Sequence, residues 1–204
     1  MRLGGSQLRA SGVVEGIKWM LDRHESRKGS PDFRGSVASM SVGLASAARA
    51  DDLDDAVKQA SAAGIHFAVT AGNQGLDACA FTPGRLSECL DVITVGAIDV
   101  NDHLLGTIGK GTNFGKCVSV YAPGQDILST WHTSPGTSVQ SGTSMACPHV
   151  SGLMAVLLAQ DESLKFATAN LKRKIIEMAI DVGKDPAKKH VTVLIANNGK
   201  KQNA

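Results

Sequence analysis

Ser144 is the residue of this sequence best placed for nucleophilic chemistry. It follows Gly142 and Thr143, and residues 145–158 after it are almost all small or apolar. Glycine allows a tight turn and hydroxyl side chains cap helix amides, so the sequence predicts a helix that begins here and is buried on every side. The positive end of a helix stabilises negative charge that develops on a serine oxygen. A plain buried helix without a chemical role is the alternative.

The exact amino-acid sequence around Ser144 is more specific evidence of function than the physical properties of a helix terminus. Residues 141–152 read SGTSMACPHVSG, and residues 64–73 read GIHFAVTAGN. The first run resembles the serine signature of the subtilisin-like serine proteases, and the second resembles the family's strand with an oxyanion-binding asparagine. Further segments match in the family's order at 77–79, 91–97 and 113–124. The chain is most similar to the cerevisin-type vacuolar proteases of fungi, within the proteinase K group.

The resemblance implies part of a catalytic mechanism. Ser144 would attack a peptide carbonyl. The Asn73 side-chain amide and the backbone N–H of Ser144 would bind the oxyanion that forms. Because residues 72–75 read Gly-Asn-Gln-Gly, an ordinary turn is the alternative interpretation of Asn73.

The resemblance also implies where a peptide substrate would bind. Residues 41–43 match the strand that pairs with substrate backbone by adding a β-strand. Residues 70–72 match the wall of the primary specificity pocket, where small residues leave an apolar slot. Leu44 stands where relatives have glycine, so their extended substrate preference does not transfer to this chain. The implied substrate-binding residues are Ser41, Val42, Gly43, Thr70, Ala71 and Gly72.

Two members of the family's catalytic triad have no counterpart in this sequence. Subtilases carry their triad in the order Asp, His, Ser. The aspartate lies in a D-[ST]-G motif and the histidine in H-G-T, and neither motif occurs here. His149 belongs to the serine signature and would point away from Ser144, one helical turn further on. We therefore expect residues 1–204 to be the C-terminal part of a subtilisin-like catalytic domain, inactive as written.

Apolar runs and amphipathic stretches alternate along the chain, which predicts a parallel sheet flanked by helices. The predicted strands are 37–42, 65–71, 92–97 and 118–121, followed by a last apolar run at 191–196; helices are predicted from Ser11, from Asp51, from Ser144 and over 169–180. The predicted fold class is α/β. The resemblance makes it a subtilisin-like three-layer fold, with a mostly parallel sheet between helices, present only as its C-terminal part. Because central strands would become edges, we expect this chain to fold poorly alone.

Composition and charge argue against several other classes. A net charge of +2 does not indicate the basic surface that nucleic-acid-binding proteins have. No stretch approaches the length of about 18 apolar residues that a membrane span needs. The first residues contain no apolar segment of the kind found in secretory signals. The resemblance nevertheless implies the secretory pathway, with a vacuolar or extracellular destination, because relatives are made with a signal and a propeptide.

The chain contains 4 cysteines. The resemblance implies a disulfide between Cys79 and Cys117, which suits an oxidising compartment; two buried thiols are the alternative. Cys147 is predicted to be a buried free thiol, and Cys89 has no assignment. No cysteine pair has zinc spacing, so no metal ligands are predicted. The chemistry requires no cofactor, although relatives often bind structural calcium and Asp99 lies near one such position.

Two hypotheses on function remain. The first is a serine-type endopeptidase, of which this chain supplies the serine and the oxyanion part. Its partners would be protein or peptide substrates and its own propeptide. The second is a catalytically inactive, truncated remnant that binds a peptide or a partner through the strand at Ser41. Ser144 and Asn73 support the first hypothesis, and the missing aspartate and histidine support the second.

Overall fold

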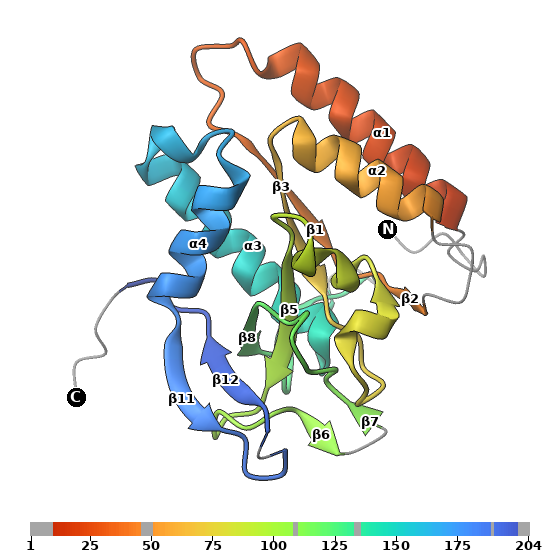
Figure 1. Cartoon of the computed structure of the whole chain (residues 1–204), viewed down its shortest axis with the longest axis vertical. Coiled ribbons are helices and arrows are strands. Elements are labelled where there is room, and N and C mark those ends of the chain that lie inside the picture. Colours follow the sequence, from red (N-terminus) through yellow and green to blue (C-terminus); the bar gives the residue numbers. More distant parts are fainter. Residues whose placement is uncertain (1–9, 46–50, 108–109, 133–135, 189, 200–204) are drawn as a thin grey trace.

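A six-stranded sheet organises the chain (Figure 1). The computed structural model describes residues 10–45, 51–107, 110–132, 136–188 and 190–199, so both ends of the predicted domain lie outside the described part. Across the sheet the strands are β1 (Ser36–Met40), β3 (Ile65–Thr70), β5 (Ile93–Ile98), β8 (Val120–Pro123), β12 (Thr192–Ile195) and β11 (Ile180–Lys184). The strands from β1 to β12 run parallel, and β11 pairs antiparallel with β12.

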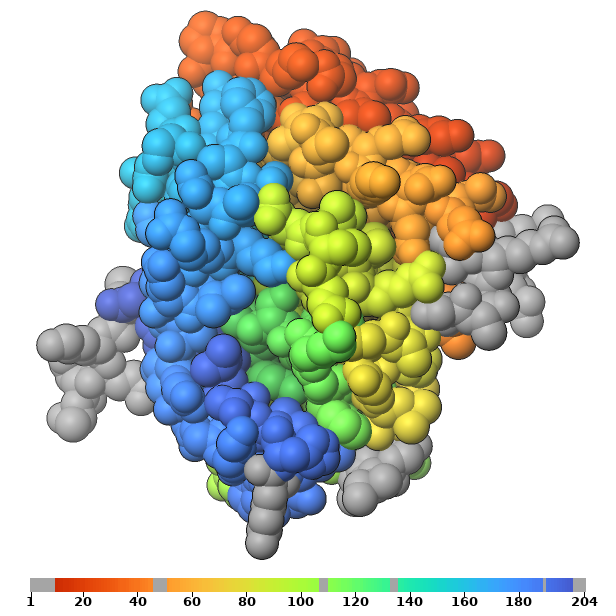
Figure 2. Space-filling view, in the orientation of Figure 1, coloured from red at the N-terminus to blue at the C-terminus, as the bar shows by residue number. Residues whose placement is uncertain are grey.

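Helices cover both faces of the sheet, which gives three layers (Figure 1). α1 (Ala10–Arg27) and α2 (Asp51–Ala62) lie side by side on one face, and α3 (Thr143–Gln160) and α4 (Thr168–Met178) cover the other. In Figure 2, α1 and α2 close one end of the molecule in red and orange, and the C-terminal elements form one flank in blue. The predicted α/β class is confirmed.

The central strands β3 and β5 are buried along their whole length. Their side chains alternate between the faces, so that Phe67 packs with α1 and α2, whereas Ala68 packs with α3. A parallel sheet covered on both faces is expected to be apolar in this way. The carboxyl ends of such strands are where ligands bind in open α/β sheets, and the loops that follow β3 and β8 carry the candidate site.

Short elements fill the loops. Three antiparallel pairs join β9 (Ile127–Thr130) to β10 (Thr137–Gln140), β2 (Leu44–Ala45) to β4 (Phe81–Thr82), and β6 (Gly106–Thr107) to β7 (Lys110–Gly111). The 3₁₀ turns in the described residues are η1 (Ala78–Ala80), η2 (Gly84–Glu88) and η3 (Glu162–Leu164). The β9–β10 hairpin leads directly into α3, so it lies close to Ser144.

Several predicted element ends are wrong by one or two residues; the strand predicted over 118–121, for example, is observed as Val120–Pro123. The strand expected over 37–42 ends at Met40, because its ladder with β3 ends there. The helix expected over 169–180 ends at Met178, since Ala179 takes an extended conformation with ψ 145° and Ile180 begins β11.

The expectation that the serine helix is buried on every side is also wrong. α3 contacts the sheet along one face, and on another face Val156 is 50% exposed.

At the edge of the sheet, β1 pairs with β3 and with no other strand in the described part of the chain. Poor folding of this chain alone stays a prediction.

Candidate active site

Ser144 lies in the first turn of α3, at the carboxyl end of the sheet. Gly142 precedes the helix with φ 141°, a backbone conformation that residues other than glycine rarely adopt. Its N–H donates to Gly124 O at 2.8 Å, which ties the start of α3 to the end of β8. Ser144 is half-buried, and its Oγ has no hydrogen-bond partner in the part of the chain that is described.

The Asn73 carboxamide is fixed against the start of α3. Asn73 Oδ1 accepts hydrogen bonds from Thr143 N at 2.9 Å and from Thr143 Oγ1 at 3.0 Å. The carboxamide oxygen is therefore occupied, and Nδ2 remains as a donor. The N–H of Ser144 is one of the first helix amides, which have no acceptor inside the helix. Asn73 and Ser144 thus present two N–H donors at one helix terminus.

Thr143 connects this terminus to the sheet, a role that the sequence analysis missed. Thr70 Oγ1 donates to Thr143 Oγ1, and both threonines are buried. Thr143 Oγ1 in turn donates to Asn73 Oδ1. A hydroxyl directly after the helix-initiating glycine is the sequence signal that could have identified it. The result is a continuous hydrogen-bonded path from the end of β3 to the Asn73 carboxamide.

The residues predicted to bind substrate surround the same terminus. Ser41 is exposed, and its Oγ donates to Ser144 O at 2.9 Å. Gly43 lies against Thr70, because a Cβ added to it would be 3.8 Å from Thr70 Cγ2. Ser41, Val42 and Gly43 continue past the end of β1 with Ser41 and Gly43 exposed and Val42 half-buried. This segment is open to pairing with an extended peptide, which stays a prediction.

The predicted pocket wall is largely buried. The Thr70 side chain is 6% exposed and Ala71 is 0% exposed, whereas Gly72 is half-buried. A substrate at this wall would therefore meet main-chain atoms more than side chains. The role of these three residues in specificity remains a prediction.

A cavity of about 490 Å³ lies beside Ser144. Met145 and His149 of α3 form one wall, and the β9–β10 hairpin with Trp131 forms the other. Leu128 and Val139 of the hairpin are exposed apolar residues. Sequence reasoning missed this wall, because residues 127–140 show neither a helical nor a strand-like apolar period.

The hydrogen-bond partners of three histidines show how they lie relative to Ser144. His149 Nδ1 hydrogen bonds to Met145 O at 2.9 Å, within its own helix. His24 and His66 are buried away from Ser144, against Ser36 and Lys165 O, and their burial lowers the pKa of both imidazoles. No histidine or carboxylate in the described segments hydrogen bonds to Ser144.

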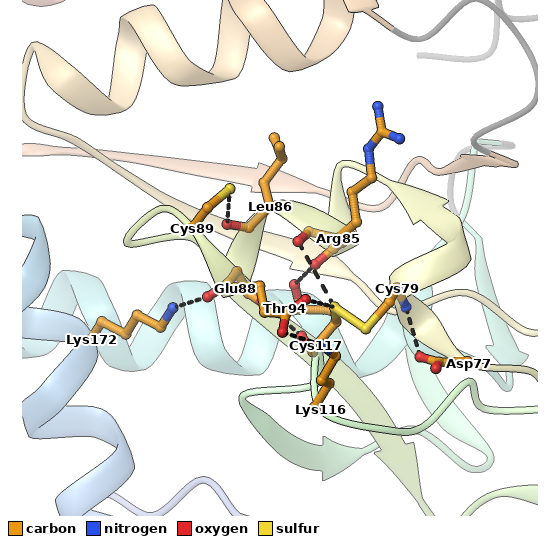
Figure 3. Close-up of a disulfide and its surroundings, with 12 residues drawn as sticks. Asp77, Cys79, Arg85, Leu86, Glu88, Cys89, Thr94, Lys116, Cys117 and Lys172 are labelled. Carbon is orange, nitrogen blue, oxygen red and sulfur yellow. Dashed lines mark hydrogen bonds and ion pairs between the residues drawn. A yellow bond between two sulfur atoms is a disulfide. The ribbon is translucent and has the colours of Figure 1, made fainter.

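The predicted disulfide between Cys79 and Cys117 is confirmed (Figure 3). Ser87 Oγ donates to Cys117 O, and Lys172 Nζ of α4 donates to Ser87 O, so α4 reaches the loop that holds the bridge. In Figure 3 the sulfur of Cys89 points to Leu86 O, away from the bridge.

Cys147 is a buried free thiol, as predicted, and burial raises its pKa. A raised pKa favours the protonated thiol, which is a poor nucleophile, so Cys147 is not expected to compete with Ser144.

Loss of the disulfide is expected to destabilise the fold. The bridge closes a loop with a sequence separation of 38 residues, so Cys79→Ser with Cys117→Ser should lower the free energy of unfolding by about 4 kcal/mol. Urea denaturation of the purified protein measures this. Cys89→Ser removes an exposed free thiol and serves as the control with no change. An unchanged urea midpoint for the double variant would contradict the expectation.

The surroundings of Asp99 do not form a compact carboxylate site for calcium. Asp99, Asp102 and Asp126 line one hollow, but Asp99 Oδ1 accepts the N–H groups of Asn101 and His103. Within the described segments, the one group of three acidic, cysteine or histidine ligand atoms within 4.8 Å comprises Glu88 and the two cysteines of the disulfide. We therefore derive no role for calcium.

Comparisons with curated proteins indicate one family. The profile of the Subtilase family matches residues 1–201. The chain is 43% identical over 175 residues to the subtilisin-like serine protease Pen ch 18 of Penicillium rubens, and 40% identical over 183 residues to a subtilisin-like protease of Coccidioides posadasii. Both alignments cover 83% of this chain, but 33% and 35% of those proteins. The chain thus spans about a third of the length of these relatives.

Solved structures agree with the predicted fold. A cold adapted subtilisin-like serine proteinase superposes with a TM-score of 0.76 and 31% identity, covering 96% of this chain and 63% of that one. Sphericase superposes with a TM-score of 0.75 at 24% identity, covering 96% of this chain and 66% of that one; this second likeness concerns the fold alone. The predicted subtilisin-like architecture, present in part, is confirmed.

Proposed function

This chain belongs to the subtilase family, and we propose that it supplies the nucleophile and the oxyanion hole of a serine endopeptidase. The observation that carries the proposal is the hydrogen bond from Thr143 N to Asn73 Oδ1, which leaves Asn73 Nδ2 as a donor at the start of α3, the helix whose first turn contains Ser144. Two fixed N–H donors next to a nucleophile are the arrangement that stabilises a tetrahedral oxyanion.

In the proposed reaction Ser144 Oγ attacks the carbonyl carbon of a peptide bond. The carbonyl oxygen becomes negative and accepts hydrogen bonds from Asn73 and from Ser144 N–H. A histidine oriented by an aspartate takes the serine proton and passes it to the leaving amine; water then hydrolyses the acyl-enzyme. In this proposal both residues come from a part of the protein outside 1–204.

The proposed substrates are proteins or peptides in an extended conformation. Their backbone would pair with Ser41–Gly43, and one side chain would enter the slot bounded by residues 70–72. The cavity beside the β9–β10 hairpin would receive a further part of the substrate. A propeptide of the same protein would bind in the same cleft.

The proposed chemistry uses protein groups alone and needs no cofactor, while a structural calcium stays a proposal without assigned ligands. We place the full protein in the secretory pathway, with a vacuolar or extracellular destination, because the disulfide suits an oxidising compartment. No nucleic-acid or membrane partner is proposed. None of the described helices combines the length and apolar character needed to cross a membrane.

An inactive remnant that binds peptides is the second candidate. The observation that favours it is that no described histidine or carboxylate hydrogen bonds to Ser144. The cleft at Ser41 could still hold an extended peptide without cleaving it.

The two candidates differ in the behaviour of the full protein. Residues 1–204 alone are expected to show no cleavage of a quenched fluorescent peptide above background, because an oxyanion hole without a base retains at most about 10³–10⁴ over the uncatalysed rate. The full protein containing these residues is expected to cleave it. Cleavage by 1–204 that disappears in Ser144→Ala would contradict the first expectation, and a full protein that binds the peptide without cleaving it would establish the remnant.

A further inference from the structure

The loop that carries Asn73 is held by a second segment, residues 111–114. Their main chains exchange four hydrogen bonds: Gly111 N to Asn73 O, Gly75 N to Gly111 O, Asn113 N to Gly72 O and Phe114 N to Leu76 O, at 2.8–3.2 Å. This ladder supports the loop on one side. Both peptide groups next to Asn73 take part in it, because the carbonyl oxygens of Gly72 and Asn73 each accept one of these bonds.

The side chain of Asn113 makes contacts on both sides of Asn73. Its Oδ1 accepts from Gln74 N and from Leu76 N, each at 3.0 Å. Its Nδ2 donates to Ala71 O at 2.8 Å and to Gln74 Oε1 at 3.0 Å. A carboxamide has two acceptor positions and two donor hydrogens, so the hydrogen-bonding capacity of Asn113 is filled.

Asn113 is 0% exposed, and it touches neither Ser144 nor the Asn73 side chain through any of these bonds. All four side-chain bonds end on residues 71–76. The hydrogen bonds of the Asn113 side chain therefore act on the conformation of the loop around Asn73.

Gly72 shows how closely Asn113 approaches this loop. Gly72 has φ 100°, and a Cβ added there would lie 2.4 Å from Asn113 Nδ2. The turn before Asn73 thus needs a glycine both for its backbone conformation and for the space that the Asn113 amide occupies.

We propose that Asn113 is a positioning residue that sets the orientation of the Asn73 carboxamide for oxyanion binding. The proposal rests on the proposed function of Asn73. Without Asn113, the amides of Gln74 and Leu76 lose their acceptor, the loop relaxes, and Nδ2 of Asn73 leaves the position where the oxyanion forms. A displacement of 1 Å at such a donor is enough to slow the chemical step while leaving substrate binding in place.

The test uses the full protein that contains residues 1–204 and the near-isosteric variant Asn113→Asp. The variant keeps the acceptor for Gln74 N and Leu76 N but cannot donate to Ala71 O. We expect kcat to fall by about 10–10²-fold with KM changed less than about threefold, because a transition-state interaction is lost. The matched control is Asp185→Asn, at a buried carboxylate that accepts the N–H groups of Leu104 and Lys188 in another loop; its kcat should be unchanged.

A double-mutant cycle distinguishes positioning from general destabilisation. If Asn113 acts through Asn73, then Asn113→Asp should cost no further kcat in an Asn73→Ala background. Equal losses in both backgrounds, or no loss in either, would overturn the proposal.

A second variant covers the case in which Asn113→Asp does not fold. Gln74 is exposed, and Gln74→Ala removes only one of the four Asn113 bonds. It should lower kcat about three- to tenfold, again only when Asn73 is present. An unchanged kcat in Gln74→Ala would count against the proposal.

Hydrogen exchange separates failure of this inference from failure of the proposed function. The amides of Gln74 and Leu76 should exchange faster in Asn113→Ala, which removes the oxygen that accepts from both, whether or not the protein is a peptidase. Unchanged exchange overturns the positioning role. Faster exchange in a protein that never cleaves peptides leaves the loop assignment intact and removes the proposed function.

Discussion

Replacement of Ser144 by alanine is expected to lower kcat of the full protein by about 10⁶-fold, the size of the effect for the equivalent residue type in the relative subtilisin. The reason is that, in the proposed mechanism, Ser144 Oγ is the atom that forms the acyl-enzyme. The fold should be unaffected, because Oγ has no partner in the described part of the chain and Ser41 bonds to the Ser144 main chain, which alanine keeps. Peptidase rates and the melting temperature of purified protein measure both effects.

Ser151→Ala is the matched control on the same helix. Its hydroxyl donates to Cys147 O at 3.2 Å and is buried, so the change can affect stability but not chemistry. Substantial cleavage by Ser144→Ala, beside a normal Ser151→Ala, would show that the nucleophile lies elsewhere.

The second large effect is expected at Asn73. Asn73→Asp keeps an oxygen for Thr143 N and Thr143 Oγ1 but replaces the Nδ2 donor with an acceptor. We expect kcat to fall by about 10²–10³-fold with little change in KM, as for loss of one oxyanion-hole donor.

Asn73→Ala separates the two roles of this side chain. It removes both the donor and the acceptor that caps α3, so it should lower kcat to a similar extent and also reduce stability by about 1 kcal/mol. If Asn73 belongs to an ordinary turn, Asn73→Asp will keep the wild-type kcat. That result would remove the oxyanion role.

The sequence predicted the framework of this fold well where local signals are strong. β3 and β5 are continuous runs of buried residues, which an apolar stretch between turn residues indicates directly. The start of α3 could be predicted because Gly142 and the hydroxyl residues after it mark a helix terminus. The disulfide, by contrast, depended on the family resemblance, since cysteine spacing alone does not define connectivity.

Features that depend on tertiary contacts could not be predicted in this way. The β9–β10 hairpin is mostly exposed and lacks alternating apolar residues, so it gave no strand signal. The exposed face of α3 was missed because an apolar composition does not show how much of a helix a partner covers.

Asn113 illustrates the same limit at the candidate site. In the sequence it is one polar residue in a glycine-containing loop, at a separation of 40 positions from Asn73. Only the fold brings it against residues 71–76, where all its hydrogen-bonding groups are used.

The most direct test of the central claim is fluorophosphonate labelling of the full protein, followed by mass spectrometry of the labelled peptide. A fluorophosphonate reacts with a serine that is activated by a base and faces an oxyanion hole. The account predicts one label, on Ser144, which is lost in Ser144→Ala and strongly reduced in Asn73→Asp. A label on another residue, or no label on a folded full protein, would contradict it.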